Sequence, residues 1–207
     1  PVFKNHTLSR PKTMRALIMR CNIGKMSWVI LLLTSLPAWS SWEVASGSVV
    51  QFISIKNNAV GELSQFESVA GTVSDEGQVD IRVALNAVET NVGIRNERMK
   101  ELLFEVGLFP EAKITAQLAP SVVSATQSQI VETTLAIDLH GQVINRTATL
   151  QVAPNEQGLS VVSVAPILLT AAEFGLESGV AALQSIAGLD AISRVIPVTV
   201  RLQLVRQ

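Results

Sequence analysis

The segment VETTLAIDL, residues 131–139, is followed directly by His140 and Gly141. Its apolar side chains occupy every second position, which is the period of a β-strand with one buried face and one solvated face. The glycine that follows marks a turn. The same alternation recurs at Val79–Ala87 and at Ile196–Leu204. We therefore predict a chain that folds mainly into strands that share one apolar core.

Shorter segments carry the same pattern between these three. They are Val49–Ile55, Val60–Phe66, Val69–Val73, Ile114–Leu118, Val143–Val152 and Leu159–Val164. Turn residues separate them, for example Asn57-Asn58, Asp75-Glu76-Gly77 and Pro154-Asn155. Many closely spaced strands favour one antiparallel barrel or sandwich. Residues 91–106 and 179–188 instead have apolar residues at helical spacing, so we predict two short helices that cover the barrel or close its mouth.

The first forty residues predict an export signal. They contain six basic residues and no acidic one, and the apolar run Trp28–Leu36 follows Arg20 and Lys25. Small residues before position 41 suit cleavage after Ser40. We predict an N-terminal extension with a cleavable signal peptide over 1–40, starting at Met14 or Met19, and a mature domain over 41–207 in the bacterial periplasm. Cleavage would leave no transmembrane anchor, and an uncleaved anchor stays open as the alternative.

The remaining residues are acidic and poor in reactive groups. Beyond residue 40, ten basic residues stand against seventeen acidic ones, a net charge of about −7, which argues against a nucleic-acid partner. The single cysteine, Cys21, lies in the predicted signal, and His140 is the only histidine after it. Because catalytic and metal sites need clustered groups of these kinds, we predict no enzyme, no metal and no cofactor.

One mixed-charge segment remains. Arg95, Arg98 and Lys100 alternate with Glu97 and Glu101, as on a solvated helix face. A positive rim that meets an anionic head group or a partner is the second interpretation.

Several motifs, taken in order, resemble the YceI-like family of secreted polyisoprenoid-binding proteins. The resemblance covers Trp42 to Arg206. It rests on Gly61 and Phe66 followed by Gly71, on Thr90 followed by Arg95-Asn96 and Arg98, on Phe104 and Phe109-Pro110, on the strand that ends at Gly141, and on Glu173-Phe174-Gly175. The chain departs from the family at Asn96, Arg98 and Leu103, where the family usually has Asp, His and Phe. An Arg95–Asn96 contact would be weaker than the family's Arg–Asp pair, because an amide replaces a charge.

The resemblance implies an all-β fold with short helices, namely an eight-stranded antiparallel, lipocalin-like barrel. Such a barrel is just wide enough for one slender ligand. We expect an isoprenoid-type lipid, such as a polyisoprenoid or an isoprenoid quinone, to occupy its pore. The candidates for the pore lining are Phe52, Phe66, Leu85, Leu103, Phe104, Phe109, Leu135, Ile137, Phe174 and Leu202. Candidate contacts to the head group at the rim are Arg95, Asn96 and Arg98.

Besides lipid binding, two other functions stay open at this point. Alternation shows which side chains face inward, and it leaves undecided whether the interior holds a ligand or is filled by side chains. A filled barrel would suit a non-catalytic interaction module, related to stress or to surface attachment. An enzyme acting on a lipid would need His140 to open into the pore beside a second polar group. A homodimer is compatible with each of these functions.

Overall fold

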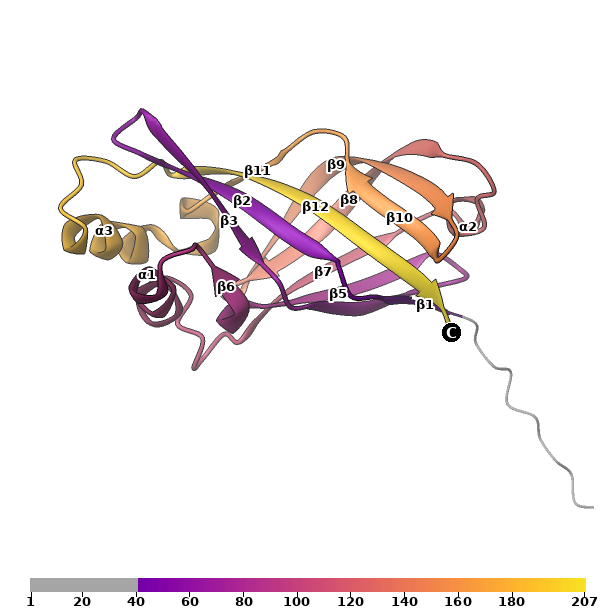
Figure 1. Ribbon diagram of the computed structural model, residues 1–207, viewed down its shortest axis with the longest axis horizontal. Helices are drawn as coiled ribbons and strands as arrows, with labels where there is room; N and C mark the ends of the chain where they lie inside the picture. Colours follow the sequence, from indigo (N-terminus) through magenta and orange to yellow (C-terminus); the bar gives the residue numbers. More distant parts are fainter. Residues whose placement is uncertain (1–40) are drawn as a thin grey trace, which may run out of the picture. The chain divides into compact units, whose positions relative to one another are not determined.

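Eight antiparallel strands close into a barrel in the computed structural model, which describes residues 41–207 (Figure 1). The predicted signal peptide and the bond after Ser40 lie outside these residues. In sheet order the barrel strands are β1 (Ser41–Val44), β4 (Val69–Ser74), β5 (Gln78–Ala84), β7 (Glu111–Gln117), β8 (Gln129–Leu139), β9 (Gln142–Asn155), β10 (Gly158–Ser163) and β12 (Val195–Arg206). The barrel closes where β12 pairs with β1, so the predicted fold class is confirmed.

Four further strands lengthen the barrel wall. β2 (Val49–Lys56) and β11 (Ile167–Thr170) pair with the N-terminal half of β12, one on each side. β3 (Val60–Phe66) pairs with β2, and β6 (Val88–Glu89) pairs with β3. Each pair continues the antiparallel pattern. As a result, the wall extends well beyond β1 at one end of the molecule.

Helices cover the two ends of the barrel (Figure 1). At the end where the β2–β3 hairpin projects lie α1 (Gly93–Arg98), the π-helical turn η2 (Met99–Leu103) and α3 (Glu177–Ile186). Two 3-10 turns are η1 (Leu85–Ala87) and η3 (Ala172–Phe174). At the opposite end lies the short helix α2 (Pro120–Val123). No helix within residues 41–207 is long and apolar enough to cross a lipid bilayer.

Most predicted elements are confirmed, with two corrections to their limits. The strand predicted through Ala87 ends at Ala84, where η1 begins. The turn predicted at Pro154-Asn155 lies further along, because β9 continues to Asn155 opposite Gly158. There the Asn155 side chain accepts a hydrogen bond from the Gln157 amide at 2.9 Å, which closes the turn after the asparagine.

The β8–β9 hairpin shows how the sequence fixes the register of the barrel. Leu139 pairs with Gln142, so the turn contains only His140 and Gly141. Both residues have positive φ, 53° and 75°, as a type I′ turn requires. This turn twists in the same sense as its strands and fixes a long pairing that runs back to Gln129 and Val152.

Gly179 allows α3 to pack closely on η2. A Cβ at this position would lie 2.5 Å from the Leu102 carbonyl oxygen and 2.8 Å from the Leu103 Cα. We expect Gly179→Ala to lower the free energy of unfolding by about 1–3 kcal/mol, because the two helices must separate. Denaturant unfolding measures this change. Gly93→Ala in α1 is the matched control, since its Cβ would meet nothing within 4 Å, and an equal loss in both variants would contradict the explanation.

Candidate ligand-binding cavity

The inner faces of the strands enclose a cavity of about 460 Å³. Valine, leucine, isoleucine and phenylalanine make up most of its wall. One strand follows the cavity along its length, with Ile196, Val198, Val200, Leu202 and Leu204 of β12 all in the lining. The alternation that predicted the strands therefore separates the cavity face from the outer face.

Nine of the ten candidate lining residues lie in the cavity wall. They are Phe52, Phe66, Leu85, Leu103, Phe104, Leu135, Ile137, Phe174 and Leu202. Phe109 is not among the lining residues. Its ring packs on the ring of His140, with centroids 4.3 Å apart, because the chain leaves η2 toward the β8–β9 turn before β7 begins.

Aromatic rings form part of the wall near η2. The ring centroids of Phe52 and Phe66 are 5.4 Å apart, and Phe66 meets Phe104 edge-on at 5.6 Å. Met99 and Leu85 are buried in the same cluster. This packing ties the helical end of the wall to strands β2 and β3.

Polar groups gather where the cavity reaches the surface. Ser54, Lys56, Thr90, Arg95 and Arg98 all line this part of the wall. Val92 and Ile94, two apolar residues between Thr90 and Arg95, also line the cavity, although 43% and 60% of their surface is exposed. The cavity therefore opens beside α1, and we call this end the mouth.

Of the α1 residues at the mouth, the sequence interpretation named Arg95 and Arg98 and missed Ile94. It also missed Ser54 and Lys56. Strict alternation would have found Ser54 and Lys56, because they follow Phe52 at every second position of β2. A lysine at the end of a strand is usually solvated, so it attracts little attention in a sequence.

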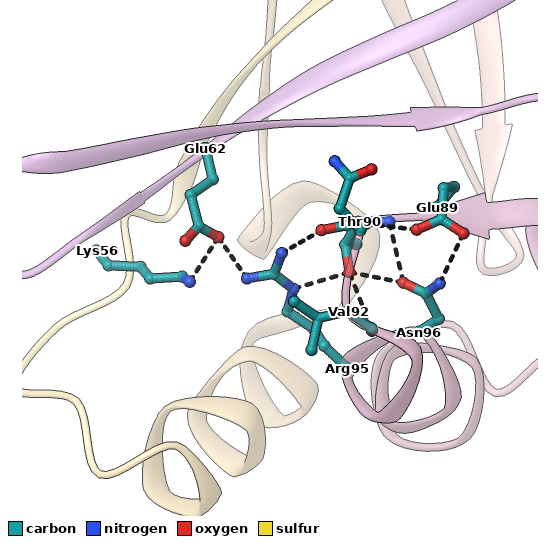
Figure 2. A network of polar contacts seen from close by, with 8 residues as sticks. Lys56, Glu62, Glu89, Thr90, Val92, Arg95 and Asn96 are labelled. Atoms are coloured by element: carbon teal, nitrogen blue, oxygen red, sulfur yellow. Dashed lines mark hydrogen bonds and ion pairs between the residues drawn. The ribbon is translucent and has the colours of Figure 1, made fainter.

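Arg95 is held in place by a polar network (Figure 2). Its Nε donates to the Thr90 hydroxyl at 2.8 Å, and its two other nitrogens donate to the Thr90 carbonyl and to Glu62. Lys56 donates to the same Glu62 oxygen. The Lys56 ammonium, and after it the Arg95 guanidinium, hold the pKa of Glu62 below its ordinary value. The charges of Lys56 and Arg95 are therefore partly neutralised by one carboxylate.

Asn96 does not contact Arg95 in the way that the sequence suggested. Its Oδ1 accepts hydrogen bonds from the Thr90 amide at 3.0 Å and from the Thr90 hydroxyl at 2.6 Å (Figure 2). Its Nδ2 donates to Glu89 at 3.1 Å. Because Asn96 is only 8% exposed and absent from the cavity wall, it positions Thr90 and does not face the interior.

Arg98, unlike Lys56 and Arg95, has no carboxylate partner among the described residues. Its side chain is half-buried and lines the cavity. Within residues 41–207 its guanidinium has no hydrogen bond and no ion pair. A half-buried guanidinium beside an apolar wall gains from any acceptor that enters the cavity.

His140 lies apart from the large cavity. Its Nε2 is 2.8 Å from a Glu105 carboxylate oxygen, and its ring contacts Phe109. His140 does not line the large cavity; together with Glu105 it lines a smaller pocket.

The hydrogen bond between Asn96 and Glu89 leads to a prediction about charge. The Asn96 amide, and after it the Asn91 backbone amide, lower the pKa of Glu89. Asn96→Asp replaces that donor with a second carboxylate, so we expect a lower melting temperature at neutral pH. Repulsion raises the pKa of the new pair, and the deficit relative to wild type should shrink as acid protonates it.

Melting curves in neutral and in mildly acidic buffer measure this effect. The double variant Glu89→Gln/Asn96→Asp is the control, because the side-chain amide introduced at position 89 can donate to the new carboxylate at position 96. A deficit that is unchanged by pH or by the second substitution would contradict the charge explanation.

The fold and the cavity define a small lipocalin-like barrel with an apolar interior that opens at one end. The sequence profile of the YceI-like domain matches residues 42–204, and the chain belongs to this family. No curated protein sequence matches the chain.

Solved structures agree with the family assignment. A polyisoprenoid-binding domain from Saccharophagus degradans, implicated in plant cell wall breakdown, is 28% identical with a TM-score of 0.77. The match covers 82% of this chain and 99% of that domain. BcnA from Burkholderia cenocepacia is 14% identical with a TM-score of 0.60, over 75% of this chain and 94% of BcnA. A mutant Campylobacter jejuni YceI protein is 11% identical with a TM-score of 0.50, over 70% and 84% of the two chains.

Proposed function

We propose that this protein binds one long isoprenoid lipid, with the tail inside the barrel and the head group at the mouth. The observation that carries the proposal is the apolar cavity, which follows β12 along its length and opens beside α1. The Saccharophagus degradans relative, a polyisoprenoid-binding domain, supports the same class of ligand. The protein would act as a binding or carrier protein in the periplasm, reached through the predicted signal peptide.

Burial of the tail is sufficient to supply the affinity. Transfer of apolar surface out of water contributes roughly 25 cal/mol per Å². A slender tail that contacts the valine and leucine wall on all sides loses most of its exposed surface. No reactive group is needed for such binding, in keeping with a protein that releases its ligand unchanged.

The head group would be one that accepts hydrogen bonds. Arg98 faces the cavity without a partner among the described residues, and Arg95 is fixed nearby by Thr90 and Glu62. A quinone carbonyl or a phosphate oxygen could accept from the Arg98 guanidinium. Such a contact would orient the lipid with its head at the mouth.

Arg98→Gln tests the head-group contact. We expect an isoprenoid phosphate or quinone to bind about tenfold more weakly, because a hydrogen bond to a charged group is lost. A plain isoprenoid hydrocarbon of the same length should bind as it does to wild type. Arg82→Gln is the control, since Arg82 lies on β5 outside the cavity. Equal losses for headed and headless lipids would exclude this role.

The proposal itself is tested by native mass spectrometry. The full chain is expressed in a bacterium, the product is purified from the periplasm, and bound material is extracted into organic solvent. A released isoprenoid lipid would support the proposal and identify the ligand. A bare protein mass, with no uptake of added isoprenoid quinone, would overturn it. The same spectra report whether the chain is cut after Ser40 and whether it forms a homodimer.

The alternative of an interaction module rests on a barrel filled by side chains. A cavity of about 460 Å³ does not fit that description. The lipid-binding function therefore accounts for the structure better.

A further inference from the structure

The helix α2 lies at the end of the barrel opposite the mouth (Figure 1). This helix contributes two side chains to the cavity lining, Val122 and Val123, which are only 5% and 3% exposed. They pack in one buried cluster with Trp42, Val152 and Leu204. Leu204 and Val152 also line the cavity, so this cluster forms its floor.

The floor is attached to the barrel on both sides of α2. Before the helix, the Leu118 amide donates to the Gly77 carbonyl at 2.9 Å. After it, the Gln129 side-chain amide at the start of β8 donates to the Ser121 carbonyl at 3.4 Å. A short helix fixed in this way presents its two valines at a constant depth.

The depth of the cavity can be stated from β12. Its lining residues run from Ile196 to Leu204. At about 3.3 Å per residue and a strand tilt of roughly 35–45°, this wall spans about 20 Å along the barrel axis. An extended chain gains about 1.2 Å per backbone bond, so an isoprene unit with four such bonds spans about 5 Å. The cavity-lining stretch of β12 above the floor thus matches about four extended isoprene units.

We propose that Val122 and Val123 set the longest isoprenoid tail that the barrel can bury in extended form. The inference rests on the proposed lipid-binding function and specifies the tail length of the ligand. Each added isoprene unit increases the affinity as long as it contacts the cavity wall. Once the tail end meets the two valines, a further unit gains nothing.

The test uses a homologous series of isoprenoid alcohols whose tails grow by one unit at a time. For wild type we expect affinity to rise about tenfold per unit and then to level off near four units. Val123→Phe raises the floor, so the longest fitting tail should bind about tenfold more weakly while shorter tails are unaffected. Val122→Ala/Val123→Ala lowers the floor, so affinity should keep rising beyond the wild-type limit.

Val162→Phe and Val162→Ala are the matched controls, because Val162 lies on β10 and does not line the cavity. If Val123→Phe fails to fold, the alanine variant decides the question alone. A tail-length limit that stays unchanged in folded α2 variants would overturn the role of α2 and leave lipid binding intact. Failure of wild type to bind any member of the series would overturn the proposed function together with this inference.

Discussion

Val200→Trp is expected to weaken isoprenoid binding at least about a hundredfold, since the indole would occupy the space of roughly two isoprene units. Val200 lies midway along the cavity-lining residues of β12 and pairs with Val50, which also lines the cavity. The melting temperature should be retained, because the ring enters existing space and displaces no packed neighbour. Binding is measured by displacement of a fluorescent isoprenoid analogue.

Arg201→Trp provides the control for this experiment. Arg201 is the next residue of β12, is exposed, and does not line the cavity. The Arg201→Trp substitution adds the same indole to the outer face of the barrel and should leave isoprenoid binding unchanged. Wild-type affinity in Val200→Trp would show that the ligand does not use the cavity.

Gly71→Ala is expected to cost about 3 kcal/mol or more of unfolding free energy, because it adds a steric clash to an unfavourable backbone conformation. Gly71 has a φ of +140°, and a Cβ there would lie 2.1 Å from the Asp80 carbonyl oxygen and 2.8 Å from the Ile81 Cα. The contacts are with backbone atoms of the paired strand β5, so β4 and β5 would have to separate. Chemical denaturation measures the loss.

Gly61→Ala serves as the comparison for Gly71→Ala. Gly61 lies in β3, and its Cβ would meet only the Ile53 side chain, at 3.7 Å. Its stability should remain close to that of wild type. Similar losses in both variants would show that the cost is not the clash with β5.

Alternation predicted a barrel or a sandwich because each strand has one buried face and one solvated face, and the family resemblance implied the barrel. Val79, Ile81 and Val83 alternate with polar neighbours, and all three line the cavity. Strands β1 and β11 escaped prediction because each has only four residues, too few for a period to be recognised. The helix α2 escaped for the same reason, since its four residues end in two valines that favour strands.

The candidate site was predictable by strand face and not by contact. Alternation correctly placed Leu135 and Ile137 toward the interior. It could not show that Asn96 turns away from Arg95 to bind Thr90, because that depends on how α1 leaves β6. Nor could alternation place Phe109. This residue lies in a loop, and its ring contacts the His140 ring, which belongs to a turn distant in the sequence.

Strand β12 pairs with β1, β2, β10 and β11, and it follows all of them along the chain. The barrel wall therefore has a gap until residues 195–206 have been synthesised and docked. Contacts between such distant segments form slowly, so folding should be limited by this last step. A chain in which residues 195–206 have not yet docked has no closed interior, so under the proposed function it could not yet enclose a lipid tail.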